Sequence, residues 1–357
     1  MKILNLGGVL FRLQLKLVLL STSMESSRRG VLTIAYGAPK YLRMGRALAL
    51  SIRHHDEGES LAVVTDTPEY FDGVYDHVIP VDTSYGSGVA QKLHSDLYSP
   101  FEETLFIDSD CLLYGPTDPL WSLFGEDKSF GIRSLGRYTR GETHGPNVKN
   151  FDQYLDYFGV EGIFNVKGGY YYFDDSEEAT EVFESSRDIY EKRDEVGLTA
   201  FKNAPVAQET VVGTALVLCG IEPIPHRQNT PHGVAFFPVD TLLGATKPIE
   251  IDVLEGESTY MKEGTVREPA SIHYAQNNQA EYCYLKDVNR LELKGAPVGE
   301  LQARVQAAVE YMGYWGGQKL KNTRSRVREM GPIGFLPGRI LKRFGIREGS
   351  PGARDAG

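Results

Sequence analysis

Short apolar runs alternate with segments of helical spacing in the first third of the chain. Each run is bounded by turn-forming or acidic residues, and the four runs are Gly30–Tyr36, Leu61–Thr65, Tyr75–Val81 and Thr104–Ile107. Runs of this length with these boundaries predict buried strands. Between them, Tyr41–Arg53 and Gly88–Leu97 have a helical pattern. The order strand, helix, strand, strand, helix, strand predicts an α/β fold with a largely parallel, Rossmann-like sheet flanked by helices.

The ends of the first and fourth predicted strands fix where a ligand would bind. Parallel strands present their carboxyl ends at one edge of the sheet, and ligands bind beyond that edge. Tyr36 ends the first strand and Asp108 follows the fourth. We therefore expect both residues at the same edge.

The pattern is less regular in the middle of the chain. Arg133–Asn150 is rich in Gly, Arg and Thr and predicts a long loop, whereas Asn165–Phe173 predicts a turn that leads into an aromatic strand. Ser176–Lys192 has helical character, and Ala270–Tyr274 predicts a late strand. Ala207–Leu218 predicts a helix with a buried face made of Val211, Val212, Ala215 and Leu216. Apolar residues then recur at helical spacing at Leu301, Val305, Ala308, Val309 and Met312.

The amino-terminal segment lacks the sequence pattern of a folded domain. Phe11–Leu20 is apolar, but polar residues interrupt it at Arg12, Gln14 and Lys16. It is therefore too short and too mixed for a membrane span, and less clean than a secretory signal. Two readings stay open: a leader outside the fold, or a start codon placed too early, with Met24 as the true start.

The carboxyl-terminal tail differs in charge from the rest of the chain. Residues 318–347 hold nine Lys or Arg and one Glu, in a chain with a net charge of −10. Apolar residues alternate with these basic ones, a composition that suits a peripheral anchor on an anionic membrane. A solvated tail is the alternative, and the sequence favours neither.

Composition narrows the class of protein. Hydrophobic residues make up 41% and charged residues 24%, as in soluble globular proteins. The acidic balance argues against nucleic acid as a partner. Three widely spaced cysteines give neither a disulfide framework nor a zinc motif, which favours a reducing, cytoplasmic location.

The chemistry centres on two aspartates. Asp108 and Asp110 flank Ser109 after the fourth predicted strand, and the apolar Cys111–Leu113 follows. Carboxylates between apolar segments need a partner, and hard divalent cations prefer carboxylate ligands. Such a cation can bridge diphosphate oxygens and stabilise the leaving group. An isolated Asp-x-Asp is also common as a solvated turn, so the motif alone leaves both readings open.

Two segments, Gln91–His94 and Glu103–Leu113, resemble glycosyltransferase family 8, the group of glycogenin and the lipopolysaccharide sugar transferases. That family has a Lys-Leu pair on a helix, followed by a strand that ends in Asp-x-Asp, as these segments do. Asp118–Phe124 is similar to the family's usual continuation. The resemblance extends from about Val31 to Tyr274, and the order of the elements is more specific than any one motif.

The resemblance implies a GT-A fold and a nucleoside diphosphate sugar donor, usually UDP-linked. It further implies Mn²⁺ or Mg²⁺ and transfer, with retained configuration, to a carbohydrate, lipid-linked or protein acceptor. Asp108 and Asp110 match the family's metal-binding aspartates, and His273 matches the late histidine that completes the metal shell. A neutral imidazole is a suitable ligand for Mn²⁺.

The other matched residues concern the donor and the reacting sugar. Those matched to the nucleotide and its phosphates are Ala35, Tyr36, Tyr41, Lys92 and Ser109. Those matched to the asparagine-glycine turn beneath the donor sugar are Asn165, Gly168 and Gly169. The residues beside the reacting face are Gln208 and Glu209, which with Lys92 are the predicted catalytic residues. Each also has a purely structural reading, as a strand end, a surface charge, a turn or a helix cap.

This sequence departs from the family at several positions. Gln276 and Gln279 stand where the family often has a glycine and a pyrophosphate-binding lysine, for which Lys286 is a candidate substitute. Ala207 stands where glycogenin-like members carry an aspartate, so acceptor choice is expected to differ.

Three other functions compete with glycosyl transfer. A haloacid-dehalogenase phosphatase carries its Asp-x-Asp on the first strand with Thr or Val four residues later, whereas Leu112 stands there and the strand is about the fourth. A sugar nucleotidyltransferase needs a Gly-rich basic loop, for which Ala35–Lys40 is a poor match. A non-catalytic nucleotide-sugar or glycan-binding protein would lack the metal ligands.

The predicted organisation has three parts. Residues 1–29 are the leader or misassigned start, and residues 30–290 form the GT-A domain. Residues 291–357 form a helix and the basic amphipathic tail.

Overall fold

The computed structural model describes residues 28–142, 146–200, 206–225, 231–235, 250–253, 264–267, 269–275, 278–280, 282–293 and 299–330. The predicted leader up to residue 27 and the tail beyond residue 330 lie outside the described residues. Within the described part, no helix combines the length and the hydropathy needed to cross a membrane.

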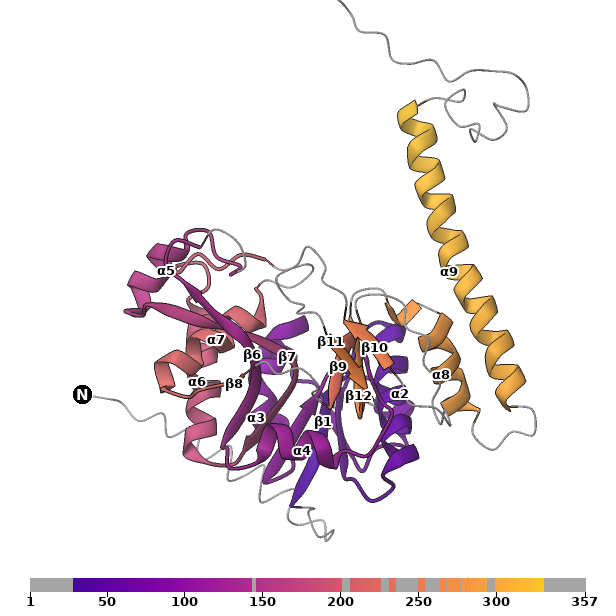
Figure 1. The fold of residues 1–357 in the computed structure, drawn as a ribbon, viewed down its shortest axis with the longest axis horizontal. Helices are drawn as coiled ribbons and strands as arrows, with labels where there is room; N and C mark the ends of the chain where they lie inside the picture. The colour runs from indigo at the N-terminus through magenta and orange to yellow at the C-terminus, as the bar shows by residue number, and fades with distance from the viewer. Residues whose placement is uncertain are drawn as a thin grey trace, which may run out of the picture.

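A seven-stranded sheet forms the centre of the described structure (Figure 1). In spatial order its strands are β3 (His77–Pro80), β2 (Leu61–Thr65), β1 (Arg29–Ile34), β4 (Glu103–Ile107), β7 (Gly162–Asp174), β6 (Phe130–Thr139) and β8 (Ile224–Pro225). The first four are mutually parallel, and β8 is parallel to β6. Only β7 runs against both of its neighbours. The prediction of an α/β fold with a largely parallel sheet is confirmed.

Helices cover both faces of this sheet. On one face, α6 (Glu177–Glu191) and α7 (Gln208–Cys219) join a core with the inward residues of β4, β6 and β7. On the other face, α2 (Pro39–His55) and α4 (Asp118–Gly125) form a second core. The predicted inward face of α7 is confirmed, since its four apolar residues are all buried. Ser176 caps α6 by accepting a hydrogen bond from the Ala179 N–H, which fixes where that helix begins.

The predicted loop at Arg133–Asn150 is wrong for its first seven residues. Residues up to Thr139 belong to β6, which pairs with β7 through two register shifts. Its outer residues are exposed, so they lack the apolar alternation that marks a strand. A helix, α5 (Phe151–Phe158), then begins at Asn150, whose side chain accepts from the Gln153 N–H.

The predicted helix at Gly88–Leu97 is a 3-10 segment, η3 (Gly88–His94), followed by one short turn of α-helix, α3 (Ser95–Tyr98). Gly86 and Gly88 both have positive φ angles, which set the tight entry into this segment.

A small sheet lies beside the second core. Its strands are β5 (Cys111–Leu113), β12 (Ser271–Tyr274) and β9 (His232–Ala235), with β12 in the middle. β12 is antiparallel to β5 and places His273 opposite Cys111. The strands β10 (Glu250–Val253) and β11 (Gly264–Arg267) pair with each other.

Two helices complete the described chain. α8 (Tyr282–Glu292) packs on α2 through a third core, and α9 (Gly299–Met330) packs on α8 and then extends away from the body (Figure 1). Arg43 of α2 joins the three helices through ion pairs with Glu292 and Glu310. The predicted helix at Leu301–Met312 is confirmed, but Val305, Val309 and Met312 are more than half exposed.

Candidate metal and donor site

Asp108 and Asp110 lie in the turn that joins β4 to β5. The Asp108 N–H donates to the Gly169 carbonyl at 2.9 Å, which ties the turn to β7. The Cys111 N–H donates to the Asp108 carbonyl at 3.0 Å, which closes the turn. Both aspartates therefore sit at the carboxyl end of a central strand, where ligands bind in sheets of this kind.

The two carboxylates have different partners. Asp110 Oδ1 lies 3.0 Å from His273 Nε2, and its Oδ2 accepts from the Gln279 amide at 2.9 Å. The Tyr274 N–H donates to the Asp110 carbonyl at 2.9 Å, so β12 is held to the turn by backbone as well as side chain. Gln279, which stands where the resemblance suggests a lysine, thus contacts a predicted metal ligand.

Asp108 instead forms an ion pair with Lys92. Lys92 lies on η3, its side chain is 17% exposed, and its Nζ also lies 5.5 Å from the centre of the Phe106 ring. Asp110 and Glu209 are within electrostatic range of the same ammonium group. The site therefore combines a fixed cation with three carboxylates.

Burial and neighbouring charges set the pKa values of this cluster. Burial raises the pKa of Asp108, and the ion pair with Lys92 offsets only part of that rise. Burial also acts upward on the Asp110 pKa, but His273 outweighs it and holds that pKa below its usual range. Conversely, burial acts to lower the His273 pKa, and Asp110 raises it above its usual value. Asp110 and His273 thus favour a carboxylate–imidazolium pair.

Two glycines let β7 pass close to the site. A Cβ on Gly169 would lie 2.7 Å from His273 Nδ1, and a Cβ on Gly168 would lie 3.0 Å from the Gln208 Oε1. Both residues fall in a bulge of β7, where the register with β6 jumps between Ile132 and Arg133. The predicted turn at this point is a strand irregularity, and its glycines permit the close approach of the backbone to His273 and Gln208.

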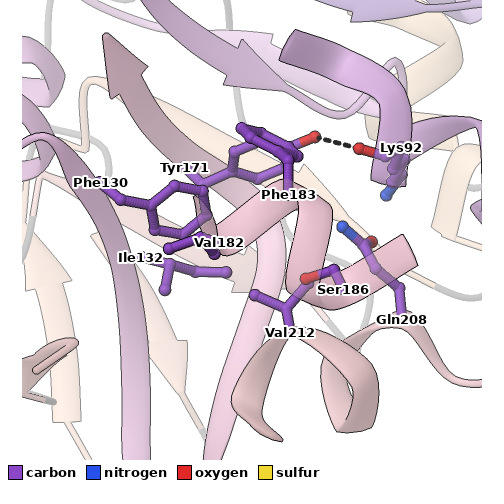
Figure 2. Close-up of a pocket in the computed structure, with 9 residues that line it drawn as sticks. All are labelled: Lys92, Phe130, Ile132, Tyr171, Val182, Phe183, Ser186, Gln208 and Val212. Carbon is purple, nitrogen blue, oxygen red and sulfur yellow. Dashed lines mark hydrogen bonds between the residues drawn. The ribbon is translucent and has the colours of Figure 1, made fainter. Parts of the chain in front are cut away.

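Gln208 and Glu209 form the first turn of α7, as predicted from the sequence. Gln208 is buried, and Glu209 is within electrostatic range of both Lys92 and Lys167. Figure 2 shows a small cavity lined by Lys92 and Gln208 together with apolar residues from β6, β7, α6 and α7. The Tyr171 hydroxyl donates to the Lys92 carbonyl at 3.3 Å on its wall. Two of the predicted catalytic residues therefore line one cavity.

The residues matched to the nucleotide lie at the neighbouring strand end. The Tyr36 hydroxyl accepts from the Gly88 N–H at 2.6 Å, which connects the end of β1 to η3. Tyr41 is 42% exposed, with Lys40 Nζ 4.7 Å from its ring centre. Ala35 is a core residue, 1% exposed, and its N–H donates to the Val64 carbonyl at 2.9 Å, so little of it is accessible to a ligand.

The structure also describes three other predicted residues, which are Ser109, Asn165 and Lys286. Ser109 is half-buried between the two aspartates. Asn165 precedes the bulge in β7, and its carbonyl accepts from the Ser134 hydroxyl at 3.2 Å. Lys286 is buried in α8, with its Nζ 5.7 Å from the ring centre of Tyr282 on the same helix.

Cys111 is a site residue that the sequence reasoning missed. Ligand atoms of Asp110, Cys111 and His273 all lie within 4.8 Å of one another. Burial raises the pKa of the Cys111 thiol well above its usual value, so the thiol stays protonated and is a poor ligand for a hard cation. Only the pairing of β5 with β12 reveals this proximity, and no local motif marks it.

No protein-family model matches the sequence, and no curated protein matches it. Solved structures that are similar include galactosyltransferase LgtC in complex with donor and acceptor sugar analogues, at 12% identity over 78% of this chain and 95% of that chain, with a TM-score of 0.44. The bifunctional glycosyltransferase WbbM, in its apo form, is 12% identical over 80% of this chain and 52% of its own, with a TM-score of 0.46. Glycosyltransferase GlyE of Streptococcus pneumoniae TIGR4 is 14% identical over 56% of this chain and 46% of its own, with a TM-score of 0.38.

The chain thus spans about half the length of the WbbM and GlyE structures. At these identities and scores, the likeness alone carries no inference about the activity of this chain.

Proposed function

We propose that this chain is a metal-dependent glycosyltransferase of the GT-A type. It moves a hexose from a nucleoside diphosphate sugar, UDP-linked, to a carbohydrate, lipid-linked or protein acceptor with retention of configuration. The observation that carries this proposal is the turn after β4, which presents Asp110 to His273 and Asp108 to Lys92. One turn thereby offers a cation site and a fixed positive charge side by side, as a diphosphate leaving group requires.

The donor set of the turn fits Mn²⁺ or Mg²⁺. Asp108, Asp110 and His273 supply carboxylate and imidazole groups, which these cations accept, whereas the Cys111 thiol is protonated. Gln279 orients the Asp110 carboxylate through its second oxygen. When bound, the cation neutralises charge on the departing diphosphate.

The protein's own residues supply the remaining electrostatic and positioning roles in the reaction. Lys92, held by Asp108, adds positive charge where the diphosphate develops negative charge, and this electrostatic help is the main catalytic contribution. Gln208 and Glu209 stand at the start of α7 beside the glycine bulge, and we expect them to lie beneath the anomeric carbon of the donor sugar. Retention of configuration then requires either a nucleophile, for which these two residues are the candidates, or attack by the acceptor on the same face as the leaving group.

We further propose that α9 and the basic tail contact an anionic membrane peripherally. Val305, Val309 and Met312 form an exposed apolar stripe on α9, on the opposite side of the helix from the buried Ala303 and Ala307. The helix positions that continue this spacing are Gly316, Leu320, Thr323, Val327 and Met330. Five basic residues lie between 319 and 328, so a second copy of the helix would be repelled, whereas anionic lipid complements their charge.

The first test of transfer needs no known acceptor, because water serves as a slow one. A panel of nucleotide sugars is incubated with and without Mn²⁺, using wild type, Asp110→Ala and the exposed control Asp72→Ala. We expect metal-dependent release of the nucleotide from one donor, unchanged in Asp72→Ala and reduced at least about 100-fold in Asp110→Ala. Full activity of Asp110→Ala with metal present would refute the assignment. Metal-dependent binding of UDP without release from any donor would favour the non-catalytic binding protein.

A further inference from the structure

The small sheet presents its two faces to different parts of the protein. Successive residues of a strand point to opposite sides, so His273 and Tyr274 of β12 face different neighbours. On the His273 side, Ser271 Oγ lies 2.7 Å from the hydroxyl of Tyr170 on β7. Tyr274 is fully buried on the other side, in the core shared with α8. Because the two residues are adjacent on one strand, whatever fixes Tyr274 also fixes the backbone that carries the imidazole.

Every polar group of Tyr274 is hydrogen-bonded. Its N–H donates to the Asp110 carbonyl at 2.9 Å. Its carbonyl accepts from the Gln279 amide, which also donates to Asp110 Oδ2 at 2.9 Å. Its hydroxyl lies 2.5 Å from the hydroxyl of Tyr114, the residue that follows β5. Tyr274 therefore connects the aspartate turn to the core shared with α8.

A buried carboxylate ends this chain of hydrogen bonds. The Tyr114 hydroxyl donates to Asp287 Oδ2 at 2.8 Å, and Asp287 lies on α8 and is 0% exposed. A tyrosine hydroxyl has one proton to donate. Since Tyr114 gives its proton to the carboxylate, it accepts the proton of Tyr274 in the contact between the two tyrosines. Asp287 thus sets the direction of both hydrogen bonds and holds the Tyr274 side chain through Tyr114.

Burial in this core does not by itself force a hydroxyl to be paired. Tyr284 lies in the same core, with its ring centre 4.8 Å from that of Tyr274. Its hydroxyl is buried and has no hydrogen-bond partner within the part of the chain that the structure describes. The bonds that join Tyr274 to Asp287 therefore call for an explanation other than burial.

The imidazole next to this chain of hydrogen bonds has little freedom to move. Asp110 Oδ1 lies 3.0 Å from the His273 Nε2, and a Cβ on Gly169 would lie 2.7 Å from its Nδ1. Binding sites work when their side chains are held within about 0.5 Å of the productive geometry. A small displacement of β12 would therefore move His273 out of place for a shared cation.

We propose that Asp287 is a positioning residue for the cation site. Through Tyr114 and Tyr274 it holds β12 where His273 and the Asp110 turn can bind the same ion. Asp287 lies beyond Tyr274, where the resemblance to glycosyltransferase family 8 ends. The proposal rests on the proposed function for the cation itself, whereas the anchoring of β12 can be measured without it.

The first test measures the anchoring of β12 without metal. Hydrogen exchange of the main-chain amide at position 274 is followed in wild type, Tyr274→Phe and the control Tyr284→Phe. Loss of the Tyr274 hydroxyl breaks the link to Asp287, so we expect exchange to become about 2- to 10-fold faster, the value of one hydrogen bond. Tyr284→Phe removes a hydroxyl of the same core that has no partner in the described chain, so its exchange should match that of wild type. Equal exchange in all three proteins would overturn the anchoring.

The second test separates positioning from stability. Mn²⁺ affinity, by calorimetric titration, and the unfolding temperature are measured for Asp287→Leu, Asp287→Asn and the control Val288→Ala. Asp287→Leu removes the acceptor, and we expect Mn²⁺ binding to weaken about 10-fold, as when a partner that orients a metal ligand is lost. Asparagine keeps an oxygen that can accept from Tyr114, so Asp287→Asn should recover most of the affinity. Val288 is 1% exposed on the same helix, so Val288→Ala should lower the unfolding temperature without weakening Mn²⁺ binding.

Tyr274→Phe keeps the aromatic ring and should weaken Mn²⁺ binding to a similar degree, so it replaces Asp287→Leu if that variant does not fold. Wild-type affinity in these variants, or an equal loss in Val288→Ala, would overturn the positioning role. Absence of Mn²⁺ binding by wild type would refute the proposed cation site and with it this role of Asp287. The exchange measurement would still decide whether the chain of hydrogen bonds anchors β12.

Discussion

At the scale of single residues, Gly169 is where the backbone and the site approach most closely. A Cβ at this position would lie 2.7 Å from His273 Nδ1, which leaves no room for a side chain. In Gly169→Ala the imidazole must shift from the position in which its Nε2 contacts Asp110. We expect Mn²⁺ affinity, measured by calorimetric titration, to fall about 10- to 100-fold, as when the orientation of a metal ligand is lost. Gly58→Ala is the matched control, because its Cβ would meet nothing nearer than 3.8 Å. Unchanged affinity in Gly169→Ala would show that His273 is not a ligand.

His273 also makes the proposed metal site sensitive to pH. Its pKa is raised by Asp110 despite burial, and below that pKa a cation must displace the proton that the imidazole carries. The Mn²⁺ dissociation constant should therefore fall as pH rises from about 6 to about 8. The stability of the metal-free fold depends on pH in the opposite direction. The Asp110–imidazolium pair stabilises it at low pH, and this contribution is lost as pH rises through the raised pKa. In His273→Gln the pH dependence of Mn²⁺ binding in this range should largely disappear. A dependence equal to that of wild type would assign the titration to another group.

Whether a site residue could be predicted depends on whether the sequence around it marks it as functional. Asp108 and Asp110 follow a strong apolar strand, and the resemblance supplied His273. The structure brings Asp110 and His273 into contact, whereas Asp108 pairs with Lys92. Cys111 carries no local signal, because it reaches the site only through the pairing of β5 with β12.

At the scale of elements, predictability follows how completely each element is buried. β2 and β4 are flanked by neighbours on both sides and covered on both faces, so their sequences are nearly continuous apolar runs. β6 is buried only in its first half, and its exposed half resembles a loop in sequence. α8 was missed for a different reason. It buries Lys286, Asp287 and Asn289, so polar residues interrupt its apolar face.

The element most open to experiment is α9, with its exposed apolar stripe. Val309→Asp places a charge in that stripe, whereas Gln306→Asp places the same charge at an exposed polar position of the same helix. Sedimentation with vesicles containing anionic lipid should show weaker binding for Val309→Asp, by several-fold or more, and a smaller change for Gln306→Asp. Removal of residues 318–357 should abolish binding. Equal binding of the full and the shortened chain would exclude the membrane contact.

At the scale of the whole molecule, a ligand that spans the site should stabilise the entire fold. The proposed cation ligands come from the central sheet and from the small sheet, so binding links both to the folded state. With Mn²⁺ and UDP together at about 100 times their dissociation constant, unfolding should require about 2.7 kcal/mol more. The corresponding rise in unfolding temperature should be absent in Asp110→Ala. A rise of equal size in that variant would place the ligand elsewhere.

The joining of Asp110 to β12 has a consequence for how the protein is made. Gln279 and Asp110 are 169 residues apart in the sequence, yet they share a hydrogen bond beside His273. On the ribosome, the aspartate turn emerges long before the imidazole that completes it. The nascent chain therefore exposes the Asp110 carboxylate without its partners, although Lys92 is already available to Asp108, and the site matures only when the segment with His273 and Gln279 has been synthesised.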